Sequence, residues 1–341
     1  MARAVVLRET DPPVAPASEH ATIAVLIPCY NEEVTIAAVV RQFKEQLPES
    51  DIYVFDNNSS DDTVAEAISA GAIVARERRQ GKGYVVQSMF QQINADVYVI
   101  VDGDGTYPAE EVQRILGPVL ADEADMVIGS RLHTKSQSQF RTLNRLGNRL
   151  FLTILNWTFK VRITDMLSGY RAFSRRFVKS VPLFGGGFET ETELTIKALQ
   201  RGFRIAEVPI NLGIRPKGSF SKIRIAHDGL RIANTLLALF RDYKPLTFFG
   251  TVGLVLILIG LIPAFVVVFE FLETGLVSSL PSAVLAVGLV LSGLLALTVG
   301  LVLHTIVRRS QEFDHQLRVL SDEMKYQIKQ ELAQRREGKV N

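Results

Sequence analysis

Short apolar runs alternate with polar, glycine-containing loops through the first third of the chain. The runs are rich in β-branched residues and predict five buried strands, at residues 23–27, 52–55, 73–75, 97–101 and 126–129. After the first run, residues 31–33 are expected to open a helix with Ile36, Val39 and Phe43 on its apolar face. Strands that alternate with helices at this spacing predict an α/β fold with a Rossmann-like, doubly wound, mostly parallel sheet.

The hydrophobic pattern changes after Lys244. Residues 246–269 carry no charge over 24 positions, and residues 280–307 carry none apart from the titratable His304. Each stretch exceeds the roughly 20 apolar residues that a bilayer-spanning helix needs. The sequence therefore predicts two transmembrane helices.

Charges around these two stretches predict their orientation. Basic residues lie outside the pair and acidic residues lie between them: Arg241, Lys244, Arg308 and Arg309 against Glu270 and Glu273. By the positive-inside rule, both termini and the α/β domain face the cytoplasm. We expect a multi-pass protein of the cell (inner) membrane.

The chain is thus expected to have five parts. Residues 1–20 hold Pro12, Pro13 and Pro16 and have no apolar segment of signal-peptide length, which favours a disordered leader. The other parts are an α/β domain at 21–222, a juxtamembrane amphipathic helix at 223–245, the two transmembrane helices at 246–307 and a cytoplasmic amphipathic tail helix at 308–341.

Two features of the C-terminal half predict association between helices. Gly288, Gly293 and Gly300 give the second span a small-residue face, which favours pairing either between the spans or between protomers. The tail carries Phe313, Leu317 and further apolar residues at spacings of three and four. This surface either docks on its own domain or joins protomers. We favour the second and expect a homo-oligomer.

Composition and charge narrow the class of protein. The chain is 47% hydrophobic with a mean hydropathy of +0.17, and its apolar excess lies after residue 245. A formal net charge of +2 indicates no nucleic acid as principal partner. The single cysteine, Cys29, excludes an intramolecular disulfide and a Cys-rich zinc site, and we expect it to be a small buried hydrophobe.

Two carboxylates follow the strand at 97–101. Asp102 and Asp104 are separated by Gly103 and followed by Gly105. In open α/β sheets, ligands bind beyond the carboxyl ends of the strands, and two hard oxygen donors there suit Mg²⁺ or Mn²⁺ bridged to a substrate diphosphate. Taken alone, the same tetrapeptide is also typical of a tight turn.

The other loops at this edge carry groups that a nucleotide can use. Tyr30 can stack on a base, Glu32 and Asp56 can accept hydrogen bonds from base or ribose, and Lys82 and Arg131 can meet phosphate. Each also has an ordinary alternative as a turn residue, a helix N-terminal charge or a surface charge. The glutamates Glu189, Glu191 and Glu193 are explained by the dipole of a helix that begins there.

Two basic segments can face a membrane. Residues 139–160 read as a basic amphipathic helix, with Arg145 among its cations, that suits an anionic lipid surface or is an ordinary surface helix. The segment at 215–222 is a cationic stretch that can close over phosphates, attract acidic lipids, or both.

Together these loops resemble glycosyltransferase family 2, specifically its polyprenyl-phosphate membrane branch of dolichyl-phosphate mannose or glucose synthase-like enzymes. Seven motifs, in order, carry the resemblance: residues 27–32, Asp56 with Ser59 and Asp61, 81–83, 102–105, 129–131, 168–171 and 215–222. The resemblance covers about residues 22–245. It implies a GT-A fold.

The resemblance also implies roles for particular residues. The nucleotide-binding set is Pro28, Tyr30, Glu32, Asp56, Lys82, Asp102 and Gly103, and the metal ligands are Asp102 and Asp104. The catalytic set is Asp104 with Arg131, Arg215 and Lys222, which neutralise phosphates. The acceptor-binding set is Arg131, Arg145, Ser168, Tyr170, Arg171 and Ser219. Where some relatives place a metal-assisting glutamine, this chain has Thr106.

The activity implied is inverting transfer of a sugar, with glucose as first choice, from a nucleotide-diphosphate sugar to polyprenyl phosphate. UDP is favoured over GDP as the carrier. Because a phosphomonoester has a second pKa of about 6, such an acceptor is largely dianionic near pH 7 and requires no general base.

Three alternatives stay open. A processive polysaccharide synthase would need more spans, and the chain lacks a Gln-x-x-Arg-Trp stretch. A non-catalytic membrane scaffold or nucleotide sensor would keep the fold without turnover. A flippase would need several chains to form a pathway.

Overall fold

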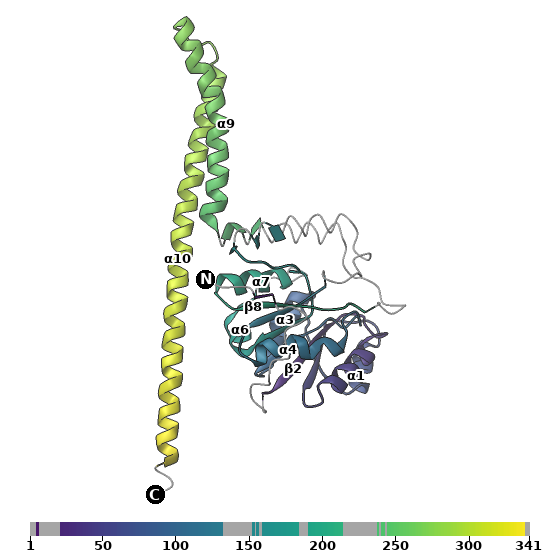
Figure 1. Cartoon of the computed structure of the whole chain (residues 1–341). Coiled ribbons are helices and arrows are strands. Elements are labelled where there is room, and N and C mark those ends of the chain that lie inside the picture. The colour runs from purple at the N-terminus through teal and green to yellow at the C-terminus, as the bar shows by residue number, and fades with distance from the viewer. Residues whose placement is uncertain are drawn as a thin grey trace. The chain divides into compact units, whose positions relative to one another are not determined.

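The computed structural model describes most of the chain (Figure 1). The described residues are 5–6, 21–131, 152–153, 155–156, 159–183, 190–213, 237–238, 240–242 and 244–337, with only the backbone for most of 311–337. They divide into two compact units, Met1–Thr235 and Leu236–Asn341.

The first unit is built on one mixed sheet. Its strands are β1 (Val5–Val6), β2 (Ile23–Cys29), β3 (Asp51–Asp56), β4 (Ile73–Arg76), β5 (Val97–Ile100), β6 (Met126–Ser130), β7 (Arg171–Ser174) and β8 (Ile205–Pro209). Their order is β1-β8-β6-β7-β5-β2-β3-β4, and every neighbouring pair is parallel except the two that involve β7. The mostly parallel α/β sheet is confirmed, and the five predicted strands match within two residues at each end.

Helices cover both faces of the sheet. They are α1 (Ile36–Gln46), α2 (Thr63–Ser69), α3 (Lys82–Gln92), the 3₁₀ turn η1 (Ala109–Glu111), α4 (Val112–Leu120), α6 (Arg175–Ser180) and α7 (Thr190–Gln200). Alternate strand residues fill two cores. Val25 and Ile27 pack with Phe43 of α1, whereas Tyr98 contacts Phe90 of α3 on the opposite face. This arrangement is the doubly wound one expected.

The first helix begins later than expected. Asn31 has a left-handed φ of 53°, and the amides of Thr35 and Ile36 donate to the Glu32 carbonyl, so residues 31–35 form a turn. The helix starts at Ile36. The prediction that it opens at residues 31–33 was wrong because the asparagine adopts the turn conformation that this residue type tolerates.

Two residues of the expected leader form a short strand. Val5–Val6 pairs in parallel with Ala206 and Glu207 of β8. The rest of residues 1–20, most of the expected basic helix at 139–160 and the whole segment at 215–222 lie outside the described residues.

The second unit contains two long apolar helices, α9 (Pro245–Thr274) and α10 (Leu280–Glu337). Pro245 sits at the helix N-terminus, where its missing amide hydrogen costs nothing, and Gly275 ends the helix with a left-handed φ of 68°. The segments Pro245–Thr274 and Leu280–Ser310 are long and apolar enough to cross a bilayer. The backbone of α10 continues through the tail, which is helical as predicted.

Small residues bring α9 and α10 into close contact. Gly253 and Gly260 on α9, and Ala286, Gly293 and Gly300 on α10, are buried at seven-residue spacing. A Cβ atom on Gly293 would lie 2.6 Å from Ile257 and 2.7 Å from the Gly253 carbonyl oxygen. Gly293 and Gly300 therefore pair the two spans within one chain, which decides between the alternatives left open for them. The homo-oligomer stays a prediction.

Replacing Gly293 by valine is expected to weaken this helix pair, because the branched side chain would push the two backbones apart. The expected loss is about 1–3 kcal/mol of unfolding free energy, the usual cost of overpacking. Thermal unfolding of the purified protein in detergent measures it. Gly288→Val is the matched control, since a Cβ at Gly288 meets nothing within 4 Å. Equal destabilisation by both variants would contradict this account of the interface.

Candidate active site

The loops at the carboxyl ends of the parallel strands are joined by hydrogen bonds. The Asn31 amide donates to Ser59 Oγ at 2.9 Å, which links the loop after β2 to the loop after β3. The Thr35 hydroxyl donates to the Gly103 carbonyl at 2.7 Å and links the first loop to the one after β5. Segments far apart in the sequence therefore form one edge, as parallel strands require.

The predicted nucleoside residues lie next to one another at this edge. Pro28 pairs in register with Phe55, and Cys29 pairs with Asp56, so Tyr30 follows directly beside Asp56. Asp56 is 2% exposed and accepts from the Ser59 amide at 3.1 Å, whereas Tyr30 is 41% exposed. Cys29 is buried, as expected, and its sulfur would lie 2.8 Å from a Cβ at Gly103. Only glycine allows this approach of the Asp102–Asp104 turn.

Asn57 organises the loop that leads to Lys82. Its side-chain amide donates to the carbonyls of Glu77 and Arg79 at 2.9 and 2.8 Å, and its oxygen accepts from the Gly81 amide at 2.7 Å. Gly81 has a φ of 137°, a backbone conformation that needs glycine. Asn57 cannot be singled out from the sequence, because a run of polar residues does not reveal which one turns inward.

Lys82 lies between two carboxylates. Its Nζ is 2.5 Å from Asp102 Oδ1 and 2.5 Å from Glu191 Oε1, and its side chain is 12% exposed. Burial by itself would lower the pKa of Lys82, but the two carboxylates raise the pKa above its usual value. The lysine is therefore held as a cation at the point where a phosphate was expected to meet it.

The helix-dipole explanation of the α7 glutamates was incomplete. Glu191 and Glu193 are 7% and 4% exposed, and Glu193 Oε1 lies 2.6 Å from Nζ of the buried Lys197. Each described glutamate of this group thus faces a lysine instead of solvent. Glu189 lies outside the described residues.

The Asp102–Gly105 segment does form a tight turn, and it also presents both carboxylates. Asp104 Oδ1 accepts from the Thr106 amide at 3.0 Å and from its hydroxyl at 2.6 Å, and Gly105 has a φ of 71°. The Asp102 carboxylate packs on Gly169, where any Cβ would overlap it. In the part of the chain that the structure describes, no group of three or more His, Cys, Asp or Glu side chains could hold a metal.

Arg131 is clamped by Asp165. Its Nε and Nη2 donate to the two carboxylate oxygens at 2.7 and 3.0 Å, and its backbone amide donates at 3.0 Å. Asp165 is completely buried, which tends to raise its pKa, but the guanidinium beside it lowers the pKa below its usual value. Arg131 Nη1 also lies 3.5 Å from the Tyr107 hydroxyl, which accepts from the Gly169 amide at 3.0 Å. The clamp is thereby linked to the glycine that supports Asp102.

Three expected acceptor contacts have interior side chains. Ser168, Tyr170 and Arg171 are each at most 1% exposed. Arg171 donates to the Ser168 and Met166 carbonyls and to the Thr195 hydroxyl, and burial lowers its pKa to about 10. β7, which begins at Arg171, pairs with both β5 and β6. The assignment of these three residues to acceptor binding stays a prediction.

Four other expected site residues, Arg145, Arg215, Ser219 and Lys222, lie outside the described residues.

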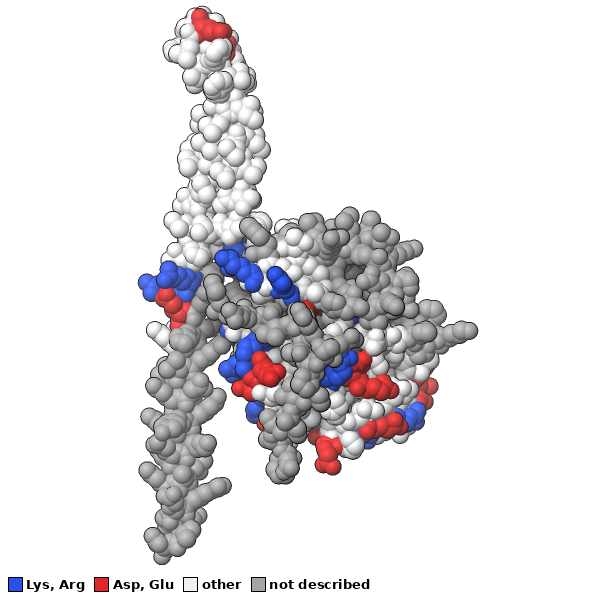
Figure 2. Space-filling model, in the orientation of Figure 1, with Lys and Arg blue, Asp and Glu red and all other residues white. Residues whose placement is uncertain are grey.

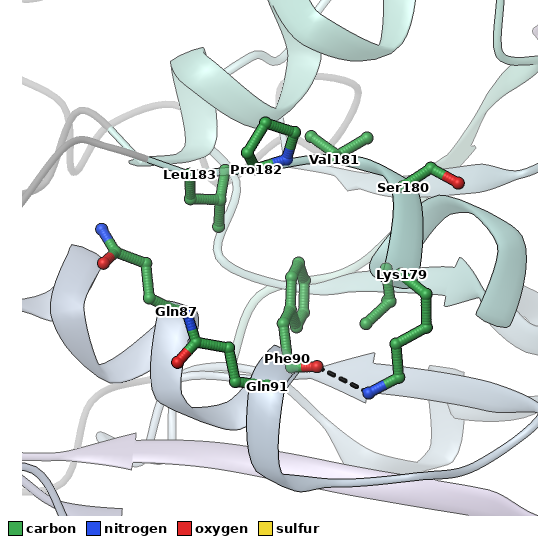
Figure 3. A pocket seen from close by; sticks show the side chains of 9 residues that line it. Gln87, Phe90, Gln91, Lys179, Ser180, Val181, Pro182 and Leu183 are labelled. Carbon is green, nitrogen blue, oxygen red and sulfur yellow. Dashed lines mark hydrogen bonds between the residues drawn. The ribbon is translucent and has the colours of Figure 1, made fainter. Parts of the chain in front are cut away.

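A pocket of about 490 Å³ lies elsewhere, between α3 and the segment that follows α6 (Figure 3). Lys179 borders it and donates to the Phe90 and Ile93 carbonyls at 2.7 and 2.8 Å, which caps the C-terminal end of α3. Lys82 begins the same helix at its other end. None of the predicted site residues lines this pocket.

Known proteins are similar to this chain in sequence and in fold. Residues 24–181 match glycosyl transferase family 2. Glycosyltransferase AglJ of Haloferax volcanii is 34% identical over 250 residues, covering 73% of this chain and 82% of the relative. The chain belongs to glycosyltransferase family 2. The dolichyl-phosphate hexose transferase of the same organism is 31% identical over 189 residues, 55% of this chain and 81% of that relative.

A solved structure of another transferase superposes on the family 2 domain. Glucosyl-3-phosphoglycerate synthase of Mycobacterium tuberculosis, in complex with Mn²⁺ and UDP-glucose, is 27% identical with a TM-score of 0.54. The match covers 64% of this chain and 79% of that one. It confirms the GT-A-like fold that the family resemblance implies.

Gly169→Ala is expected to disable the site without unfolding the domain, because the new methyl group must displace the Asp102 carboxylate and with it the Lys82 ion pair. Overpacking typically costs about 1–3 kcal/mol. If this free energy is lost from the stabilisation of the transition state, sugar transfer falls by roughly 10- to 100-fold. Activity and thermal unfolding are measured together. Gly117→Ala serves as control, since a Cβ there meets nothing within 4 Å. Full activity of Gly169→Ala would show that the carboxylate position is unimportant.

Proposed function

We propose that this protein transfers a hexose, glucose as first choice, from a UDP-linked donor to polyprenyl monophosphate with inversion at the anomeric carbon. The family shows sugar transfer; the lipid acceptor is supported by the dolichyl-phosphate hexose transferase relative and by two helices of bilayer length in the same chain. The UDP donor is supported by the UDP-glucose complex of the structural relative.

The ion pairing of the two α7 carboxylates is the observation that favours a phosphate acceptor over a hydroxyl acceptor. A hydroxyl acceptor needs a carboxylate or other base to take its proton. Glu191 and Glu193 are buried and each faces a lysine at 2.5 or 2.6 Å, so neither is poised to accept a proton. A phosphate acceptor that is already largely dianionic at pH 7 suits such a site.

The main requirement of such a reaction is to offset the repulsion between an anionic acceptor and an anionic donor. A phosphate oxygen of the acceptor attacks the anomeric carbon as the bond to the leaving diphosphate breaks, and anionic groups must approach each other. Arg131 presents a guanidinium held in one orientation by Asp165, and Lys82 contributes a permanent cation beside Asp102. Arg215 and Lys222 are proposed to add to this charge from the segment after β8.

Asp102 and Asp104 fit a divalent cation of the Mg²⁺ or Mn²⁺ type. Such ions accept one or two carboxylates and keep water and substrate phosphates as their remaining ligands, so a pair without a third acidic side chain is sufficient. When bound, the cation would neutralise the diphosphate of the donor. The Thr106 hydroxyl orients Asp104 at the position where relatives with a glutamine place a further metal-assisting group.

The membrane orientation is also a proposal. Within the second unit, acidic side chains without basic neighbours lie at the turn between α9 and α10, whereas the basic side chains lie at the other end of the pair with a few acidic ones beside them (Figure 2). This asymmetry favours a cytoplasmic location for both termini and for the transferase domain. Cytosolic sugar nucleotides would then be accessible to the site.

Asp104→Ala is expected to lower transfer by at least about 10²-fold, the scale seen when one electrostatic contributor to a transition state is removed. The assay incubates detergent-purified protein with polyprenyl phosphate and a panel of UDP- and GDP-sugars, with and without Mn²⁺, and weighs the lipid product by mass spectrometry. Glu123→Ala, an exposed acidic residue outside the site, should retain full activity. Absence of a sugar-linked lipid from every donor with the wild-type protein would refute the proposal and favour a non-catalytic scaffold.

Glu191→Gln separates a phosphate acceptor from a hydroxyl acceptor. If Glu191 serves only to hold Lys82, the variant should keep more than about a tenth of wild-type activity, whereas loss of a general base typically costs 10²- to 10⁴-fold. Steady-state rates with polyprenyl phosphate across pH 6–9 measure the difference. A loss of the larger size, with the acidic limb of the pH profile removed, would reassign Glu191 as the base.

A further inference from the structure

Glu207 is a buried carboxylate that the proposed mechanism does not use. It lies on β8, is 2% exposed, and forms no ion pair with any Lys or Arg among the described residues. Its two oxygens accept from the Thr164 amide at 2.9 Å each, from the Asp165 amide at 3.0 Å and from the Thr164 hydroxyl at 3.1 Å. A buried charge satisfied only by one loop is costly, so its contacts identify its role.

The loop that Glu207 holds is the one that clamps Arg131. Asp165 donates its backbone amide to Glu207 and accepts the Arg131 guanidinium with its carboxylate. The Thr164 hydroxyl also lies 2.9 Å from Ser130 Oγ, next to Arg131 in the chain. Glu207 itself sits on a strand paired with β6, where Ile128 is its partner in register. The sheet thus fixes Glu207, Glu207 fixes the loop, and the loop fixes the arginine.

We propose that Glu207 is a positioning residue that sets the orientation of Arg131 through Asp165, and so aligns the guanidinium with a phosphate group of the substrates. This inference rests on the proposed function only in assigning Arg131 to a phosphate. Glu207 does not contact substrate.

A carboxylate is required at this position because all four contacts come from donors. A glutamine offers one acceptor oxygen, and its NH₂ group would face the amides of Thr164 and Asp165, which also donate. Aspartate keeps both oxygens but draws them back toward β8 by one methylene. Either change should release the loop, glutamine more than aspartate.

Protonation of Glu207 would have a similar effect. Burial raises its pKa to about 7, helped by the negative charge of Asp165, the charged group that faces it from the 163–165 loop. β6 contributes the uncharged Ile128 and Ser130 on this side. The pKa of Glu207 in the folded chain is higher than its ordinary value of 4.5. Glu207 therefore contributes stability below about pH 4.5, and this contribution is lost as the pH rises to about 7. In the folded chain the carboxyl ionises around pH 7, so the clamp gains its acceptors there and transfer should rise as the pH passes through about 7.

Hydrogen exchange tests the positioning role without reference to activity. The full-length protein in detergent is compared as wild type, Glu207→Gln and Asp125→Asn. Asp125 is the matched control, a 1% exposed carboxylate at the opposite end of β6 that accepts from Arg204. Amides of Asp165 and Arg131 should exchange faster in Glu207→Gln and at the wild-type rate in Asp125→Asn. Unchanged exchange at Arg131 in Glu207→Gln, or equal acceleration in both variants, would overturn the inference.

Kinetics then test the consequence. Glu207→Gln and Arg131→Lys should each lower kcat/KM for transfer about 10- to 100-fold. The double variant should have the same kcat/KM as the less active of the two single variants, because both substitutions remove the same clamp. In Glu207→Gln the rate of transfer should no longer rise near pH 7 through the ionisation of residue 207. The titration of the acceptor phosphate is the same in every variant and therefore cancels in the comparison. Additive losses would indicate a merely structural role.

Two further outcomes are separated by design. If Glu207→Gln does not fold, Glu207→Asp replaces it in both measurements and is expected to show the same pattern at smaller size. If wild-type protein makes no lipid product, the proposed function fails, and the exchange data alone decide whether Glu207 positions Arg131.

Discussion

The site depends on one buried cation shared by three distant segments. Lys82 begins α3, Asp102 follows β5, and Glu191 lies in the first turn of α7, yet both carboxylates lie 2.5 Å from the same ammonium group. Removing the lysine would leave two carboxylates unpaired in a poorly solvated place, so the interaction fixes where these elements can end. It also leaves the trio with a net negative charge, and Asp104 adds another. The proposed divalent cation would offset this negative charge.

A second principle applies to the rest of the site: polar groups that are proposed to bind substrate are held by polar groups that are not. Arg131 is oriented by Asp165, the Lys82 loop by Asn57, and Asp104 by Thr106. Each supporting residue uses directional hydrogen bonds, which restrict orientation more than packing alone would. The arrangement resembles the supporting shell around metal ligands in other proteins, where ligands work well only when their own rotamers are fixed.

The sequence predicts the strands and the loops at their ends better than it predicts the contacts that support those loops. Runs of β-branched residues identify the five parallel strands, and the Asp102–Gly105 motif lies at the end of one of them. β7 is not predicted, because Arg171–Ser174 has only two apolar residues and its burial comes from insertion between two other strands. For the same reason the motif at 168–171 is visible in the sequence while the inward direction of Tyr170 and Arg171 is not. Glu191 and Asp165 are likewise ordinary acidic residues until the fold supplies their partners.

The continuity of α10 has a mechanical consequence. Its 58 residues run without interruption from Leu280, at the turn after α9, to Glu337. At 1.5 Å per residue this is a length of roughly 87 Å. A helix of this kind transmits rotation: one residue added between the apolar part and the tail would turn everything beyond it by about 100° around the axis. The direction in which the tail presents its side chains is therefore set by the number of residues in the apolar part of the helix.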